Sequence, residues 1–217
     1  MRMKKMNFYH LISKYNRGKN RLLIRRERLE RLLPLSLPQN RLWLLSQLEN
    51  DTVHYHIPLV YKLIGNLHID LFEKALNYII NRHESLRSIF VLKDNQPWVP
   101  LLDANTFFPL IISDLRQVVD KQSEVTNILN KTIHTPFNLS HDLLICTHLI
   151  YLDKNEYIFI LNQHHIITDG WSITIFFKEL STVYNELVNH RTPALASLTL
   201  QYPDYAVWQQ SHYSSCF

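Results

Sequence analysis

The sequence has few of the features that mark a secreted, membrane-spanning or metal-centred protein. It has two cysteines, Cys146 in an apolar run and Cys216 beside the C-terminus, which form neither a disulfide framework nor a metal-ligand spacing. No apolar run approaches the roughly 18–20 residues that cross a bilayer. The N-terminus lacks the apolar segment and small-residue cleavage site of a secretory signal, and we find no internal repeat. We therefore expect a protein of the reducing cytoplasm, without a membrane span.

The chain does contain enough apolar residues for a packed core. Its 217 residues are 46% hydrophobic and 19% charged, which is ordinary for a soluble globular protein and excludes a disordered one. This length suits one sizeable domain, or one domain with an appendage.

Positive charge is concentrated at the N-terminus. Residues 1–33 hold 11 Lys and Arg against 2 Asp and Glu, whereas residues 34–217 hold 12 against 17. We therefore predict a basic arm or linker helix over 1–33 and a mildly acidic domain over 34–217. A basic arm could bind nucleic acid or an anionic membrane, but no nucleic-acid reader motif accompanies it. Such a segment is more often a solvated helix or interdomain linker, and contact with an acidic protein is at least as plausible as nucleic-acid binding. We expect no nucleic-acid partner.

Hydrophobic periodicity predicts helices and strands in irregular order. Helices are expected over 20–33, 36–48, 70–83, 118–133 and 171–188, and strands over 55–64, 86–92, 96–101, 108–112, 143–152 and 156–164. Adjacent strands joined at 94–95 and 153–155 predict two hairpins. The mixture of hairpins and helices predicts an α+β fold with a mixed β-sheet flanked by helices.

Several local signals refine these elements. Pro58 places the first strand at a sheet edge or at the strand's start. Asp70 and Glu73 form a capping box at the start of the helix over 70–83. The apolar stripe expected to face the core from this helix is Phe72, Ala75, Leu76, Ile79 and Ile80. The apolar side of the helix over 36–48 is Leu42, Trp43, Leu45 and Leu48, and we expect Trp43, Tyr205 and Trp208 in the core.

The most informative segment is His164–Ser172, in which two adjacent histidines end an apolar, β-rich run. Neighbouring side chains of a strand point to opposite faces. One imidazole can therefore face an open site while the other is held in the interior. A single oriented imidazole is what acid–base chemistry on an amine or hydroxyl requires.

Four segments together resemble the condensation domain of nonribosomal peptide synthetases, in the chloramphenicol-acetyltransferase-like superfamily. They are Leu35–Trp43, Arg82–Phe90, His164–Ser172 and Tyr202–Gln209. They are similar to the family's Ser-x-Ala-Gln-x-Arg-Leu-Trp, Arg-His-Glu-x-Leu-Arg-Thr-x-Phe, His-His-x-x-x-Asp-Gly and Tyr-x-Asp-Tyr-Ala-x-Trp-Gln motifs, with Pro38 in place of the usual alanine. The histidine motif alone is shared across the superfamily, but four motifs in order are specific.

The resemblance covers about residues 34–210 and implies one lobe of a two-lobed domain. Family members have their active site in a tunnel between two lobes, and no second set of motifs follows in this chain. We therefore expect residues 34–217 to be an N-terminal lobe whose second lobe is missing.

The resemblance also assigns roles within the histidine motif. His165 is implied as the catalytic histidine, and His164 as a structural one. Gly170 is implied to offer its backbone N–H to an oxyanion, although a plain turn glycine explains it equally. A zinc site of His164, His165 and Asp169 is disfavoured, because adjacent strand side chains diverge. We expect no metal.

The family reading of Asp169 is a buried carboxylate paired with an arginine, for which Arg82 and Arg87 are both candidates. The alternative is a helix N-cap. Trp171 and Ser172 are candidates to line the tunnel, although packing is the favoured interpretation of Trp171.

By resemblance, the intact domain joins a donor acyl or peptidyl thioester to the amino group of an acceptor aminoacyl thioester. Both substrates would be carried on phosphopantetheine arms of carrier proteins, so no cofactor is expected on this domain itself. The expected partners are carrier proteins, the second lobe and adjacent synthetase modules. The ending Asp-Gly-Trp-Ser resembles a condensing type that accepts an L-configured donor. The alternatives are a related acyl-CoA-dependent acyltransferase and a non-catalytic half-domain that binds carrier proteins.

Overall fold

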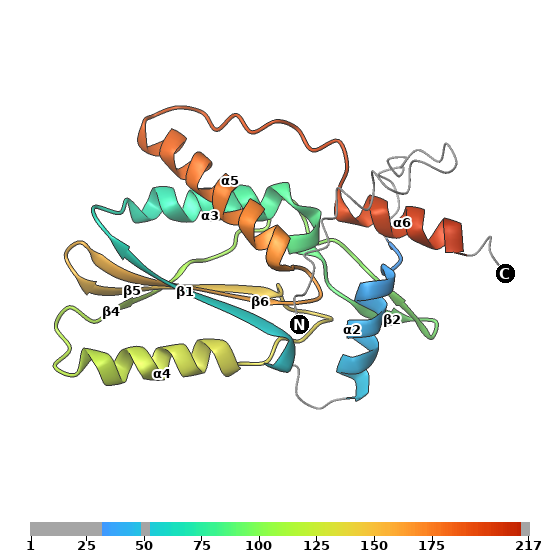
Figure 1. Cartoon of the computed structure of the whole chain (residues 1–217), viewed down its shortest axis with the longest axis horizontal. Helices are drawn as coiled ribbons and strands as arrows, with labels where there is room; N and C mark the ends of the chain where they lie inside the picture. The colour runs from blue at the N-terminus through green and yellow to red at the C-terminus, as the bar shows by residue number, and fades with distance from the viewer. Residues whose placement is uncertain (1–31, 49–52, 214–217) are drawn as a thin grey trace, which may run out of the picture.

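A computed structural model describes residues 32–48 and 53–213 and forms a mixed sheet with helices on both faces (Figure 1). The helices are α2 (Leu37–Leu48), α3 (Ile69–Arg82), α4 (Lys121–His134), α5 (Gly170–Val188) and α6 (Tyr202–Tyr213). The strands are β1 (His56–Ile64), β2 (Val91–Lys93), β3 (Gln96–Trp98), β4 (Ile111–Asp114), β5 (Ile145–Asp153) and β6 (Glu156–His164). Short 3-10 turns occupy Val53–Tyr55 and Glu84–Arg87.

The main sheet has the strand order β1-β6-β5-β4. β5 and β6 form the predicted antiparallel hairpin, and β4 joins β5 in parallel, which confirms a mixed sheet. β1 is an edge strand of this sheet, as Pro58 predicted, because proline has no N–H to donate to a second neighbour. The pairing of His56 with His164 brings the start of β1 to the end of β6.

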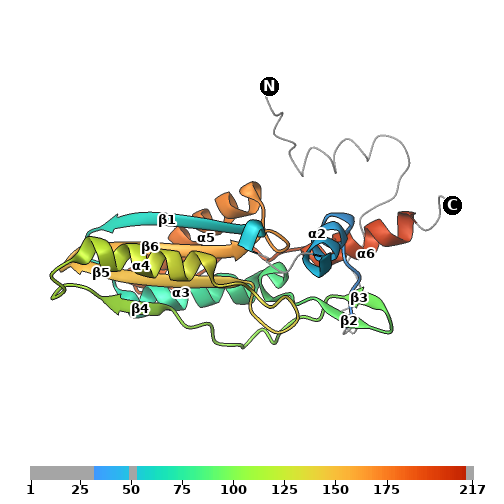
Figure 2. The same cartoon turned by 90° about the horizontal axis from the view of Figure 1, so that it is seen from below.

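The sheet separates two apolar layers. α3 and α5 cover one face and α4 covers the other, as Figures 1 and 2 show from two directions. The larger core contains the predicted stripe of α3, all of it buried: Phe72, Ala75, Leu76, Ile79 and Ile80. The smaller core under α4 packs Val125 against Ile150 and Ile160. The sheet is therefore buried on both faces around β5 and β6, and the histidines lie where β6 ends.

Two local predictions were wrong, and a third, the hairpin at 94–95, holds. α3 begins at Ile69 after His68, so Asp70 lies inside the first turn and no capping box forms; Glu73 Oε1 instead accepts from Leu110 N at 2.8 Å. The strand expected from residue 86 begins at Val91, because a 3-10 turn follows α3. The hairpin itself is confirmed, with Asp94 and Asn95 at φ of 53° and 58°, as a two-residue turn of this type requires.

The aromatic residues expected in the core are only half-buried. Trp43 packs against the edge of the larger core, and Tyr205 stacks on Trp208 with ring centroids 5.9 Å apart. Leu48, predicted on the apolar side of α2, is 74% exposed, because the helix covers the core only through its first turns. α6, which carries the fourth motif, was not predicted as a helix.

The predicted helix over 20–33 lies outside the described residues, apart from Leu32 and Leu33, which are not helical. Leu33 is buried and forms a bridge with Val99, so it packs as part of the domain. Within 32–48 and 53–213, no helix is both long and apolar enough to cross a bilayer.

Candidate active site

The candidate site forms where β6 ends, the chain turns and α5 begins. His164 N donates to Leu144 O at 2.9 Å, and His165 N donates to Tyr55 O at 2.8 Å on the other side of the strand. His164 is 0% exposed, whereas His165 is exposed. This confirms the predicted alternation, which separates the two neighbouring imidazoles into different environments.

His164 is a buried, neutral imidazole. Its Nδ1 accepts from Ile166 N at 3.1 Å, so its proton lies on Nε2. Burial, together with the neighbouring His56 and His165, lowers the pKa of His164 to about 4. The His56 ring lies 6.1 Å away in an edge-on arrangement. These contacts suit a side chain that closes the turn rather than one that meets a substrate.

His165 has one nitrogen fixed and one available. Its Nδ1 lies 2.7 Å from Thr168 O. Because a carbonyl oxygen only accepts, Nδ1 carries the proton of the neutral ring and Nε2 keeps its lone pair. A backbone carbonyl thus selects the tautomer in which the second nitrogen can accept a proton. The exposed side chain leaves that nitrogen accessible to a substrate.

Asp169 acts as the N-cap of α5. Its Oδ1 accepts from Ser172 N at 2.8 Å and from Ser172 Oγ at 2.6 Å. The backbone of Asp169 is extended, as at an N-cap, and the residue is exposed. The expectation of a buried carboxylate was therefore wrong, and the N-cap alternative describes the residue.

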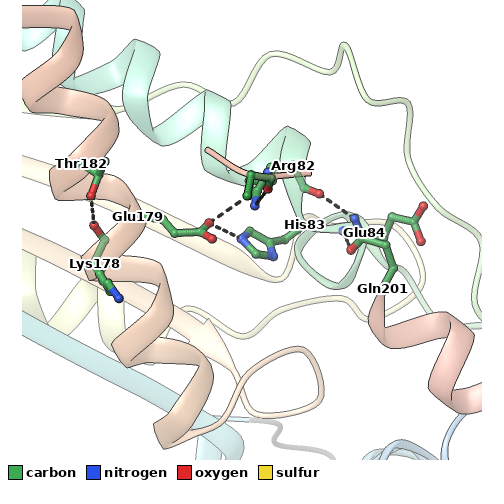
Figure 3. A network of polar contacts seen from close by, with 8 residues as sticks. Arg82, His83, Glu84, Lys178, Glu179, Thr182 and Gln201 are labelled. Atoms are coloured by element: carbon green, nitrogen blue, oxygen red, sulfur yellow. Dashed lines mark hydrogen bonds and ion pairs between the residues drawn. The ribbon is translucent and has the colours of Figure 1, made fainter. Parts of the chain in front are cut away.

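Neither candidate arginine pairs with Asp169 in the part of the chain that the structure describes. Arg82 Nε donates to Glu179 Oε2 at 3.2 Å (Figure 3). Arg82 Nη2 also donates to Ala196 O at 2.5 Å. Glu179 follows Asp169 by ten residues, about 15 Å along a helix, so Arg82 is occupied well away from the cap. Arg87 is buried near the β2–β3 hairpin, and its Nη1 donates to Leu102 O.

The Arg82 site is a polar network that joins α3 to α5 (Figure 3). His83 Nε2 lies 2.7 Å from the same Glu179 oxygen that Arg82 contacts. Burial alone would raise the pKa of Glu179, but the hydrogen bonds and charges of His83 and Arg82 lower it overall. Gln201 Nε2 donates to Arg82 O at 2.9 Å and so adds the segment before α6. Arg82 therefore holds the helix that follows the histidine turn, rather than the turn itself.

The remaining motif residues lie at the open start of α5. Trp171 is 46% exposed, so the packing interpretation was wrong for the described chain. The Ser172 hydroxyl is engaged in the cap of Asp169. A Cβ placed on Gly170 would meet no atom within 4 Å, so neighbouring packing does not require glycine there. Gly170 and Trp171 instead begin α5, and the first N–H groups of a helix have no partner within the helix.

No group of three His, Cys, Asp or Glu side chains gathers as a metal site within the described ranges. The three residues of the disfavoured zinc alternative face different surroundings: His164 is buried, His165 is bound to Thr168, and Asp169 caps α5.

Two contributors to the site were not predicted. Thr168 supplies the carbonyl that fixes His165, and Tyr55 supplies the carbonyl that holds its backbone. The position of Thr168 three residues after His165, within a tight turn, was a usable local signal. Tyr55 is distant in sequence and left no local signal.

The fold and the histidine turn define a lobe of the chloramphenicol-acetyltransferase-like type. The family model named condensation domain matches residues 29–216, and the chain belongs to this family. It is 42% identical over 180 residues to one of the linear gramicidin synthase proteins of Brevibacillus parabrevis, covering 82% of this chain and 4% of that protein. It is 36% identical over 188 residues to the dimodular nonribosomal peptide synthase of Bacillus subtilis, covering 87% of this chain and 8% of that protein.

Solved structures agree with the fold. The X-domain from teicoplanin biosynthesis aligns with a TM-score of 0.77 at 27% identity, over 90% of this chain and 41% of that one. The starter condensation domain of rhizomide synthetase RzmA aligns with a TM-score of 0.76 at 23% identity, over 85% of this chain and 44% of that one. The chain thus spans less than half of the solved domains that it resembles.

Proposed function

We propose that this chain is the lobe of a condensation domain that carries the catalytic histidine, and that it takes part in amide-bond formation during nonribosomal peptide synthesis. The observation that carries the proposal is the state of His165: an exposed imidazole whose Nδ1 is held by Thr168 O and whose Nε2 is free to accept a proton. Membership of the condensation family supports the reaction type.

In this proposal, the acceptor's α-amino nitrogen attacks the carbonyl carbon of the donor thioester. The C–N bond forms, the C–S bond breaks, and the proton lost by nitrogen passes through His165 Nε2 to the departing thiolate. A free α-amino group titrates near pH 8, so roughly a tenth of it is already neutral near pH 7. Positioning the amine and hydrogen-bonding the tetrahedral intermediate therefore contribute alongside proton transfer. The backbone N–H of Gly170, at the start of α5, is the donor proposed for that intermediate.

The proposed substrates arrive on phosphopantetheine arms of carrier proteins, which supply the thioesters. A second lobe would complete the tunnel over His165, and adjacent synthetase modules would deliver the carriers. A cytoplasmic location, where such assembly lines are supplied with aminoacyl groups, belongs to the same proposal. The Bacillus subtilis relative is a nonribosomal peptide synthase by name, which favours aminoacyl thioesters over an alcohol or amine acylated from acyl-CoA.

The test is intact-mass detection of the condensation product on the acceptor carrier protein. This chain is assayed alone and with a separately supplied second lobe, using donor-loaded and acceptor-loaded carriers. We expect product with both lobes present and none with His165→Ala. Gly170→Ala is the second variant: nothing lies within 4 Å of its added Cβ, so the lobe should keep its stability while an oxyanion contact is disturbed.

A non-catalytic role is the competing function, and the openness of the site favours it for the isolated chain. His165, Asp169 and Trp171 are all exposed, so this lobe alone does not enclose a reaction. If folded lobes give no product together but this chain still binds loaded carrier proteins, the binding role replaces the catalytic one.

A further inference from the structure

A line of buried polar contacts connects two of the other motifs, the first and the fourth, to the histidine turn. It starts at Tyr202 in α6, passes through Ser36 and Gln39 at the start of α2, and ends at the backbone of Ile166. Ser36 is 0% exposed and Gln39 is 4% exposed. The proposed function makes no use of these side chains, although they reach the residue next to His165.

Gln39 makes both of its amide contacts inside the protein. Its Nε2 donates to Ile166 O at 3.3 Å, and its Oε1 accepts from Ser36 N at 3.1 Å. An N–H must face an acceptor and a carbonyl must face a donor, so these two partners allow one orientation of the amide. Reversing the amide would bring two acceptors together and two donors together in a buried place.

Ser36 is itself held from both sides. Its Oγ accepts from Gln39 N at 3.3 Å and lies 2.8 Å from the Tyr202 hydroxyl. Burial raises the pKa of Tyr202 to about 12, so the phenol stays neutral and keeps its proton at ordinary pH. Gln209, also in α6, accepts from Leu37 N at 2.8 Å. α6 therefore fixes the start of α2, from which Gln39 reaches the turn.

The contacted carbonyl lies inside the turn that selects the His165 tautomer. Ile166 stands between His165 and Thr168, the two residues joined by the Nδ1 contact of 2.7 Å. The other contacts closing this turn are local: Ile166 N to His164 Nδ1 at 3.1 Å and Ile167 N to His164 O at 3.1 Å. Gln39 anchors the outer side of the same turn from a residue 127 positions away in sequence.

We propose that Gln39, held by Ser36 and Tyr202, is a positioning residue that keeps His165 in the Nδ1–H tautomer by fixing the turn at Ile166. Without the Gln39 amide, Ile166 O loses a buried donor and the turn loses its link to α2. Thr168 O is then no longer held against His165 Nδ1, and the neutral ring can carry its proton on either nitrogen. The effect of Gln39 on turnover rests on the proposed function, whereas its effect on the His165 tautomer does not depend on that function.

The test is NMR of the full chain with its histidine side chains labelled with the NMR-active nitrogen isotope, at about pH 8, where an ordinary imidazole is neutral. The His165 signals are identified by their loss in His165→Ala. In the unaltered protein we expect one protonated Nδ1 and one unprotonated Nε2. In Gln39→Met, which keeps the side-chain length without the amide, we expect an averaged pattern from both tautomers.

Gln47→Met is the matched control, because Gln47 lies exposed on the same helix, where its Nε2 donates to Ser46 Oγ at 3.3 Å. It should leave the His165 pattern unchanged. Tyr202→Phe removes one hydroxyl, and should shift His165 in the same direction as Gln39→Met but less. It also serves as the test if Gln39→Met does not fold, as judged by the signals of the buried His148 and His164.

An unchanged His165 pattern in folded Gln39→Met would overturn the proposal, as would an equal shift in Gln47→Met. If Gln39→Met does not fold, an unchanged pattern in Tyr202→Phe has the same consequence. The reconstituted condensation assay separates this inference from the proposed function. If Gln39→Met changes the His165 tautomer but the unaltered protein forms no condensation product, the positioning role of Gln39 stands and the proposed catalytic function is refuted. If the unaltered protein forms product but Gln39→Met leaves the His165 tautomer unchanged, the catalytic function stands and the positioning role is refuted.

Discussion

Replacing Asp169 with alanine tests whether this residue is an exposed N-cap or one partner of a buried ion pair with arginine. The two interpretations predict losses of stability of different size. As an exposed N-cap, Asp169 accepts two hydrogen bonds from Ser172, at 2.8 and 2.6 Å. Replacing an N-cap aspartate with alanine costs about 1 kcal/mol, and losing its charge at the helix start adds about 0.3–1 kcal/mol. We therefore expect Asp169→Ala to lower the free energy of unfolding by about 1–2 kcal/mol.

A buried carboxylate–arginine pair predicts a larger effect. Removing one partner there would cost about 3–5 kcal/mol, because a charge is left buried and unpaired. Urea unfolding followed by circular dichroism measures this difference, with the slope of the transition checked for constancy. Asp169→Asn and Asp169→Ser keep a capping oxygen, and each should cost about 0.5 kcal/mol or less beyond the charge effect.

Asp120 provides a matched control, because it caps α4 by accepting from Ser123 N at 3.0 Å in an exposed setting. Asp120→Ala should cost about 1–2 kcal/mol, like Asp169→Ala. A loss above about 3 kcal/mol for Asp169→Ala, with Asp120→Ala near its expected value, would refute the N-cap argument and restore the ion pair.

Two further predictions concern ionisable side chains. Glu179→Ala should lower the free energy of unfolding by about 2 kcal/mol, because it leaves the largely buried Arg82 and His83 without their carboxylate. Glu156→Ala is the control: it breaks an exposed ion pair with Lys62 and should cost less than about 1 kcal/mol. The folded-state pKa of His164, about 4, lies below the 6.5 of an ordinary histidine, so the unfolded chain binds the additional proton and stability falls as the pH drops from 6.5 to 4. His164 alone should contribute about 3 kcal/mol to this loss. Urea titrations across that range should show a shallower pH dependence in His164→Gln, and an unchanged slope would contradict the buried neutral state.

The sequence predicted elements whose determinants are local. The β5–β6 hairpin follows from alternating apolar runs around a polar turn, and the core stripe of α3 from apolar residues at helical spacing. The opposite environments of His164 and His165 follow from strand geometry alone. Each of these features depends on residues that are close together in the sequence, so the local sequence pattern is enough to predict it.

The sequence-based prediction was wrong for contacts between residues far apart in the sequence, such as the arginine partner expected for Asp169. The resemblance suggested that Arg82 or Arg87 reaches Asp169, but Glu179 competes for Arg82 from the face of α5 that packs on α3. Asp169 is satisfied within its own turn by Ser172, a contact whose formation closes almost no loop and so costs little chain entropy. Which partner an arginine finds depends on how α3 and α5 pack, and the spacing of charges along the chain does not specify that.

The two histidines are coupled through the turn they share. The neutral state of His164 leaves its Nδ1 able to accept from Ile166 N, and this contact helps close the turn that brings Thr168 O to His165. Protonating His164 would convert that acceptor into a donor facing another donor, and the turn would open on its inner side. Burial lowers the pKa of His164 to about 4 and so keeps its Nδ1 an acceptor for Ile166 N at neutral pH. The interior histidine thus acts on the exposed one through the backbone between them, although the two side chains point to opposite faces of the sheet.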